Sequence, residues 1–170
     1  MLIFEKDLNN KYDWMKIYEL LCNFSKKISK YYIYDLLANR SNKIILYSIN
    51  NLDNFELENC PCGLIYNYKK VTDNEINVCI MMISTKYNCR KYGYASTFIN
   101  EFITFIENKL KNFKTINILL DSLESAVTFY EHIGFKWIIP SDEINDMLSI
   151  KKETKLEEHF IMTYTISNET

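Results

Sequence analysis

The sequence predicts a single α/β (α+β) domain over residues 1–170, in which about four helices flank a mixed, mostly antiparallel sheet. Three observations lead to this fold class. A chain of this length can bury its apolar side chains in one core, and no linker, repeat or block of like charge divides it. The spacing of apolar residues changes from the helical period of about 3.6 to the strand period of 2 near Ile44. A long helical pattern then separates two later strands, which makes those two strands parallel.

The segment before Ile44 is expected to hold one short strand and two helices. Residues 2–8 are typical of a strand, and Asp13 suits the N-cap of the first helix. The second helix is predicted over residues 25–37 and ends near Asn39, because asparagine tolerates the left-handed conformation at a helix terminus. The apolar faces are predicted to consist of Trp14, Ile17, Tyr18 and Leu21 in the first helix, and of Ile28, Tyr31, Tyr32 and Leu36 in the second.

Three strands are predicted over residues 44–49, 63–68 and 76–84, separated by stretches rich in turn-forming residues. This spacing indicates an antiparallel meander. Residues 115–120 form the next strand, which is expected to lie parallel to the strand of residues 76–84. The helix between these two strands is predicted to be the central helix of the domain, with one apolar face made by Phe98, Ile99, Phe102, Ile103, Ile106 and Leu110.

The C-terminal part is predicted to add one helix and two strands. Ser122 suits the N-cap of the helix, and Gly134 is expected to end it in the left-handed conformation. Residues 136–139 and 160–166 are predicted as the last strands, and the polar stretch between them leaves room for a short helix or a loop. The predicted order is therefore β-α-α-β-β-β-α-β-α-β-β.

Charge and apolar runs exclude several classes of protein. The net charge is −2, and no basic stripe is present, so we expect no nucleic-acid partner. The longest apolar run, residues 78–83, is too short to cross a bilayer, and residues 1–6 lack the pattern of an export signal. We therefore expect a cytoplasmic protein without a membrane partner.

The five cysteines are an odd number, which favours reduced thiols over a disulfide framework. Cys60 and Cys62 flank a proline and are the closest approach to a metal-binding pattern. The only histidines are His132 and His159, and no second ligand pair stands at a suitable spacing. We expect no metal site.

Residue types that are rare in this chain gather in one short segment, where Arg90, Gly93 and Ala95 stand close together. A strand is predicted before the segment and a helix after it, so unpaired amides at the helix start can bind an anion. The segment lacks the Gly-Lys-Ser/Thr ending of a Walker loop and the glycines of the dinucleotide fingerprint, so it suits a diphosphate bound without magnesium. The alternative is that Gly93 only eases a turn and Arg90 is a surface charge.

A second segment, residues 125–135, extends this pattern. The chain resembles the GNAT superfamily of acyl-CoA-dependent N-acetyltransferases, whose signature is Arg/Gln-x-x-Gly-x-Gly/Ala at a pyrophosphate loop, followed later by Ala-x-x-x-Tyr-x-x-x-Gly-Phe. The order of elements is similar too, so the resemblance covers nearly the whole chain. The matching residues are Arg90, Gly93 and Ala95 in the first motif, and Ala126, Tyr130, Gly134 and Phe135 in the second.

The resemblance implies how acetyl-CoA is bound, with no metal. In the family, the strand before the loop splays from its parallel neighbour, and its exposed backbone pairs with the pantetheine arm of the cofactor. The loop amides then surround the pyrophosphate. The implied cofactor-binding residues are Ile83, Ser84, Thr85, Arg90, Lys91, Tyr92, Gly93, Tyr94, Ala95 and Ser96.

The resemblance also implies direct attack of a neutral amine on the thioester. Tyr130 matches the position whose phenol donates to the CoA sulfur in many members, although packing in the core is the alternative. Many members carry an acid on the strand before the loop, but residues 78–83 hold none, and Leu123 stands where an Asn is common. The proton acceptor is therefore left open among water, Glu75, Asp121, Glu124 and His159.

The expected function is transfer of an acetyl group from acetyl-CoA to a small-molecule amine, such as an amino sugar or polyamine, or to a protein amine. The alternative is a catalytically silent GNAT-like module that binds CoA or a protein partner. Family members often form dimers through C-terminal strands, and an exposed edge at residues 160–166 permits a homodimer. Acceptor binding is the family role of the region that holds Tyr31, Tyr32 and Tyr34, with packing as the alternative.

Overall fold

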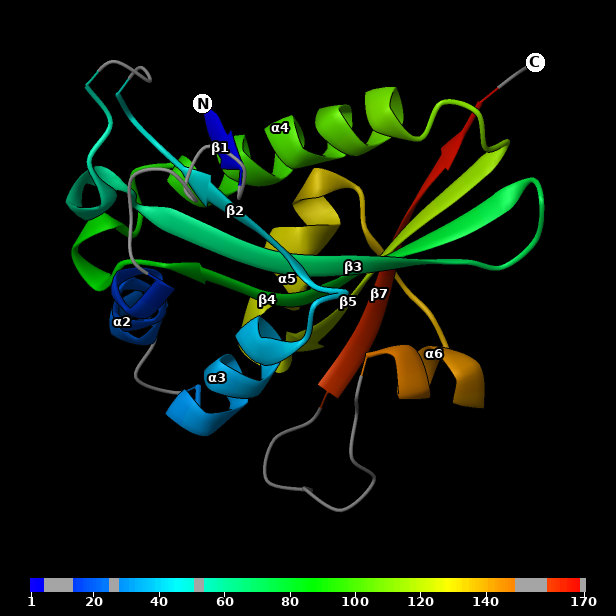
Figure 1. The fold of residues 1–170 in the computed structure, drawn as a ribbon. Helices are drawn as coiled ribbons and strands as arrows, with labels where there is room; N and C mark the ends of the chain where they lie inside the picture. Colours follow the sequence, from blue (N-terminus) through cyan, green and yellow to red (C-terminus); the bar gives the residue numbers. More distant parts are fainter. Residues whose placement is uncertain (5–13, 25–27, 51–53, 149–158, 169–170) are drawn as a thin grey trace. The chain divides into compact units, whose positions relative to one another are not determined.

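A computed structural model describes residues 1–4, 14–24, 28–50, 54–148 and 159–168 (Figure 1). Its elements are β1 (Leu2–Phe4), α2 (Trp14–Phe24), α3 (Lys30–Ala38), β2 (Lys43–Tyr47), η2 (Leu57–Asn59), β3 (Cys62–Lys70), β4 (Glu75–Thr85), η3 (Tyr87–Cys89), α4 (Tyr94–Lys109), β5 (Thr115–Leu123), α5 (Glu124–Ile133), β6 (Lys136–Trp137), α6 (Asp142–Met147) and β7 (His159–Ser167).

The sheet has seven strands in the order β1-β2-β3-β4-β5-β7-β6. Strands β4 and β5 are parallel, whereas β1–β2, β2–β3, β5–β7 and β6–β7 are antiparallel. The predicted fold class and the predicted parallel pair are therefore confirmed. The described chain divides into two compact units, one of residues 1–66 and 82–104, and the other of residues 67–81 and 105–170.

In the first unit, α2 and α3 lie on one side of β2 and β3, and the first turns of α4 lie on the other (Figure 1). Gly63 in β3 faces α2, and a Cβ atom built on it would stand 2.6 Å from Cδ2 of Leu21 and 3.0 Å from Cε2 of Phe24. On the opposite face, the rings of Tyr66 in β3 and Phe102 in α4 pack edge to face with centroids 5.1 Å apart. The strand thus contacts α2 through bare backbone and α4 through a large side chain.

The central helix is the element that the sequence predicts best. The six apolar residues of its predicted face are all buried. They recur at helical spacing over α4, so burial of one face accounts for most of the stability of this helix.

The strands on either side of this helix in the chain, β4 and β5, pair in parallel from Glu75 with Thr115 to Ile80 with Leu120.

In the second unit, β7 pairs with β5 over nine residues, from Thr115↔Ser167 to Leu123↔His159. Helices α5 and α6 lie on opposite faces of these strands (Figure 1). On the α6 face, a small core consists of Cys79, Leu119, Leu148 and Ile161. On the α5 face, Gly134 ends the helix with φ 114°, as predicted.

Three predictions about helix ends and faces are wrong in whole or in part. Asn39 follows the last residue of α3, as predicted, but its φ of −77° is not left-handed; near this end, the amide of Asn42 donates to the Leu36 carbonyl at 2.8 Å. Ser122 lies inside β5, which pairing with β7 extends, so the N-cap of α5 is Leu123. Tyr31 is 86% exposed because the buried residues of α3 are Ile33 and Leu36.

The predicted exposed edge at residues 160–166 is also wrong. Strand β7 pairs with β5 on one side, and Met162 and Thr163 pair with β6 on the other. The predicted strand of residues 2–8 is described only as β1, and Asp13 and residues 25–27 lie outside the described residues. No helix within the described ranges is long and apolar enough to cross a membrane.

Candidate functional site

The loop between β4 and α4 is held by backbone hydrogen bonds. The N–H of Lys86 donates to the Pro61 carbonyl at 2.8 Å, which ties the start of the loop to the residue before β3. The 3-10 turn η3 follows, closed by bonds from Cys89 to Lys86 (2.9 Å) and from Arg90 to the Tyr87 carbonyl (3.3 Å). The loop therefore enters α4 from a fixed direction, and the N–H of Arg90 is already engaged.

Two residues of this loop have left-handed backbone. Gly93 has φ 79° and Lys91 has φ 68°. For a residue with a side chain, this conformation costs roughly 1–2 kcal/mol. Turns built from such residues direct successive N–H groups into an anion-binding concavity. Backbone strain at Lys91 therefore marks the loop as a candidate functional segment.

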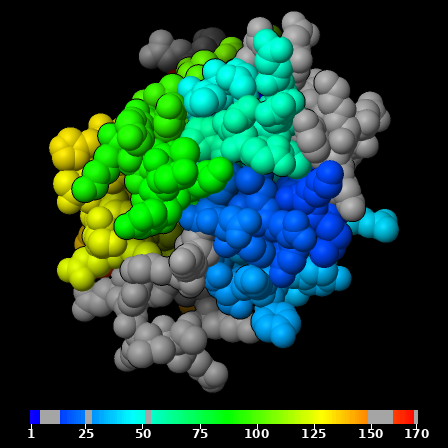
Figure 2. Space-filling view, turned by 90° about the vertical axis from the view of Figure 1, so that its left-hand side faces the viewer, coloured from blue at the N-terminus to red at the C-terminus, as the bar shows by residue number. Residues whose placement is uncertain are grey.

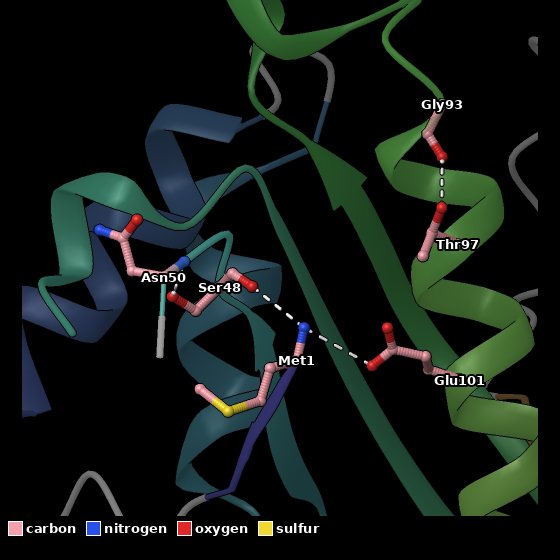
Figure 3. Close-up of polar contacts among 6 residues, drawn as sticks. All are labelled: Met1, Ser48, Asn50, Gly93, Thr97 and Glu101. Carbon is pink, nitrogen blue, oxygen red and sulfur yellow. Dashed lines mark hydrogen bonds and ion pairs between the residues drawn. The ribbon is translucent and has the colours of Figure 1, made fainter. Parts of the chain in front are cut away.

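The first turn of α4 is open to a ligand. The N–H and the hydroxyl of Thr97 both donate to the Gly93 carbonyl, at 3.1 and 3.3 Å (Figure 3). Within the described part of the chain, the N–H groups of Gly93, Tyr94, Ala95 and Ser96 have no backbone acceptor, as expected for a helix start. A Cβ atom built on Gly93 would meet nothing within 4 Å. The four donors and the helix dipole therefore favour an anion beside Gly93.

Further along α4, polar contacts fix the helix against β1 and β2 (Figure 3). The amino group of Met1 donates to the Ser48 carbonyl at 3.0 Å and lies 3.6 Å from Oε2 of Glu101. The hydroxyl of Ser48 accepts a bond from the N–H of Asn50 at 3.1 Å. Glu101 lies about 12 Å along the helix from Gly93, so these contacts hold the helix well away from its open end.

The parallel pairing of β4 with β5 ends at Ile80, although β4 continues to Thr85. The expected pantetheine-binding residues, Ile83, Ser84 and Thr85, therefore lie beyond that register. Ser84 is buried, and Ile83 and Thr85 are half-buried.

Tyr130 lies in α5 and is buried among aromatic rings. Its ring contacts those of Phe129 and Phe135 edge to face, with centroids 5.1 and 5.7 Å away. Burial raises the pKa of Tyr130 above the ordinary value of 10.0, so the hydroxyl stays protonated at neutral pH. This hydroxyl makes no hydrogen bond to another described residue. It therefore carries a proton that is available for a hydrogen bond.

The second motif places Tyr130 through packing. The N–H groups of Gly134 and Phe135 donate to the Tyr130 carbonyl at 3.2 and 3.1 Å. A Cβ atom built on Gly134 would stand 3.1 Å from the ring of Tyr164, which also packs on Phe135. The glycine thus allows both the left-handed turn and the close approach of β7.

The four candidate proton acceptors occupy different places in the second unit. Glu75 begins β4, and its Oε1 accepts a bond from Asn117 at 2.9 Å. Asp121 is half-buried in β5 and follows Leu120, the last residue paired with β4. Glu124 is exposed in the first turn of α5. His159 begins β7 opposite Leu123, and its side chain lies outside the described residues.

A cavity of about 300 Å³ is lined by Glu75 and by polar residues that the sequence pattern did not single out, among them Asn77 and Asn117. The amide of Asn117 donates to Oδ1 of Asn77 at 3.2 Å and accepts from Thr165 at 3.0 Å. Asn77 and Asn117 are direct partners in the parallel register. Two asparagines at matching positions of otherwise apolar strands are the signal that reveals this network.

The buried cysteines are suited to packing. Burial raises the pKa of Cys60 to about 12, that of Cys62 to about 11 and that of Cys79 to about 12. Thiols with such values stay protonated, whereas metal binding and nucleophilic chemistry need the thiolate. In the described ranges, no three His, Cys, Asp or Glu side chains gather at a metal-binding distance.

Aromatic residues of α2 and α3 form an exposed cluster of Trp14, Tyr18 and Tyr34. Tyr34 lies 6.2 Å from both other rings, measured between centroids. Trp14 is 41% exposed and Tyr34 is 53% exposed. Figure 2 shows the blue segment that includes α2 at the surface of the molecule. The cluster is thus accessible to a ligand.

Comparison with known proteins places the fold. No protein-family model and no curated protein sequence matches the chain. The ribosomal-protein-S18-alanine N-acetyltransferase of Escherichia coli is similar in structure, with a TM-score of 0.63 and 12% identity over 100% of this chain and 97% of that one. The catalytic domain of Tetrahymena GCN5 histone acetyltransferase, solved with coenzyme A, has a TM-score of 0.59 and 17% identity over 96% of this chain and 90% of that one.

Naa50 of Arabidopsis thaliana, in complex with a bisubstrate analogue, gives a TM-score of 0.60 and 14% identity over 96% of this chain and 97% of that one. The likeness spans nearly the whole of each chain. At sequence identities this low, the likeness shows a shared fold and nothing further.

Proposed function

Because the chain has the fold of the GNAT acetyltransferases, we propose that it is an N-acetyltransferase that moves an acetyl group from acetyl-CoA to a primary amine. The observation that carries this proposal is the open first turn of α4. Its four N–H donors stand beside a left-handed glycine with free space in front of it. A diphosphate fits this arrangement without a metal ion.

The proposed binding residues follow the chain from β4 into α4. Backbone groups of Ile83, Ser84 and Thr85 pair with the pantetheine arm, because they lie beyond the register with β5. Amides of residues 91–96 bind the pyrophosphate, and the guanidinium of Arg90 adds positive charge. Acetyl-CoA supplies the activated acyl carbon as a thioester.

Tyr130 is the proposed catalytic residue. A thiolate leaving group accepts a hydrogen bond more strongly than the thioester sulfur, so a donor placed there favours the transition state. The raised pKa of Tyr130 keeps its proton in place until the sulfur carries charge. The rings of Phe129 and Phe135 pack against the Tyr130 ring that carries the hydroxyl.

For the acceptor's proton, we favour Asp121 over Glu75. Asp121 adjoins the point where the parallel pairing ends, whereas Glu75 begins β4, about 17 Å further back along the strand. Asp121→Asn is expected to lower turnover about 100-fold and to remove the acidic limb of the pH–rate profile. Glu75→Gln, the matched control, is expected to turn over close to the wild-type rate. The reverse result would assign the role to Glu75.

The acceptor is a primary amine, either of a small molecule or of a protein. The Escherichia coli and Tetrahymena enzymes carry a protein acceptor in their names, which supports including peptides among the substrates tested. The exposed cluster of Trp14, Tyr18 and Tyr34 offers an aromatic surface for such an acceptor. The alternative function is a silent module that binds CoA or a protein partner, and the absence of an acid in residues 78–83 favours it.

The test combines donor binding with turnover. Calorimetric titration is expected to show acetyl-CoA binding, and thiol release is expected with at least one member of an amine panel. The panel holds amino sugars, polyamines, peptides with free N-termini and peptides with free lysines. Binding without thiol release on any amine would favour the silent module. No binding at millimolar acetyl-CoA would reject the transferase and a module that binds CoA, and would leave a module that binds a protein partner.

A further inference from the structure

Tyr87 is an exposed aromatic residue in the loop that leads into α4. It begins η3, and its side chain is 79% exposed. The guanidinium carbon of Arg90 lies 5.4 Å from the centroid of its ring. With so little burial, the ring adds little to the core and is open to a ligand.

Backbone contacts hold this pair in place. The N–H of Arg90 donates to the Tyr87 carbonyl at 3.3 Å, which closes the turn between them. Nε of Arg90 donates to the Thr85 carbonyl, also at 3.3 Å, so the guanidinium is anchored at one nitrogen. Its remaining N–H groups stay available for an anion. One ring face carries the cation, and most of the ring is open to solvent.

We propose that Tyr87 is the stacking surface for the adenine ring of the acetyl donor, and that Arg90 pairs with the phosphates beside it. This inference rests on the proposed function, and it adds recognition of the nucleotide end of the donor. The chemistry required is an aromatic face next to a cation and free amides. Bases stack on exposed aromatic rings, while guanidinium groups bind phosphate. Tyr87, Arg90 and the amides of Gly93 to Ser96 supply all three between η3 and the first turn of α4.

The position of Tyr87 between β4 and α4 is consistent with this role. The pantetheine arm is expected to follow the backbone of β4, and the pyrophosphate the first turn of α4. The adenosine part of the donor then needs a contact outside the buried core. Tyr87 offers that contact. Removing its ring is therefore expected to weaken the binding of acetyl-CoA and to leave the binding of a donor without the nucleotide unchanged.

The test compares acetyl-CoA with S-acetylpantetheine, which has the thioester arm but no nucleotide. Tyr87→Ala is expected to raise the Kd for acetyl-CoA about tenfold and to leave the Kd for S-acetylpantetheine unchanged. Tyr87→Phe keeps the ring and is expected to bind both donors like the wild type.

Equal acetyl-CoA affinity in Tyr87→Ala and the wild type would overturn the inference while leaving the proposed function intact. Equal weakening of both donors by Tyr87→Ala would also overturn it, because it would show a collapsed turn and not a lost base contact. Failure of the wild type to bind acetyl-CoA would reject the proposed function and this inference together.

Discussion

Replacing Gly93 with valine is expected to raise the Kd for acetyl-CoA at least about 100-fold, a loss of about 2.7 kcal/mol of binding free energy. Gly93 has φ 79°, and a side chain there would project into free space in the unbound protein. The fold therefore loses only the backbone cost of left-handed valine, roughly 1–2 kcal/mol. The bound state loses more, because the side chain occupies the space that the diphosphate needs. Calorimetric titration and urea unfolding measure the two effects separately.

Gly63→Ala is the matched control for this experiment. A Cβ atom at Gly63 would stand 2.6 Å from Leu21, so alanine is expected to lower the free energy of unfolding by about 1–3 kcal/mol. Affinity for acetyl-CoA is expected to stay close to that of the wild type. Wild-type affinity in Gly93→Val would show that the diphosphate does not approach this glycine.

The second large effect is expected from Tyr130→Phe, which should lower turnover about 1,000-fold and leave acetyl-CoA affinity within about twofold. Phenylalanine keeps the ring contacts with Phe129 and Phe135 and removes only the hydroxyl. The raised pKa means that the neutral form is favoured in the folded protein. The contribution of neutral Tyr130 to the free energy of unfolding is complete below the ordinary tyrosine pKa of 10.0. It is lost as the pH rises through the pKa that Tyr130 has in the folded protein. Below pH 10, no decline in rate should therefore arise from ionisation of Tyr130.

Tyr164→Phe provides the comparison for Tyr130→Phe. Tyr164 packs on Phe135 in the same aromatic group, with ring centroids 5.5 Å apart. Its hydroxyl has no proposed role, so turnover is expected to match the wild type. Steady-state thiol release measures both variants. An unchanged rate in Tyr130→Phe would leave that residue with a packing role only.

The sequence predicted features that depend on local pattern and missed those that depend on contacts between distant residues. Periodicity alone identified the buried face of α4. Gly134 marked the end of α5, because few residues other than glycine adopt a φ of 114°. The end of α3 depends on the amide of Asn42, and the place of Ser122 depends on pairing with β7. Helix propensity carries no information about either contact.

The candidate site divides in the same way. Rare residue types located the loop from Arg90 to Ala95, but the left-handed backbone of Lys91 could not be predicted, because lysine has no preference for it. The Asn77–Asn117 network requires the parallel register, which the pattern of each strand alone does not define. Preference for Asp121 likewise depends on where that register ends.

The three glycines occupy positions at which a side chain has a physical cost. The chain has three glycines in a composition biased toward isoleucine, lysine and asparagine. At Gly63 a side chain would collide with α2, and at Gly93 and Gly134 it would be strained by a positive φ. Each of the three glycines therefore stands where a side chain carries a physical cost, and only Gly93 has free space around it in the unbound protein.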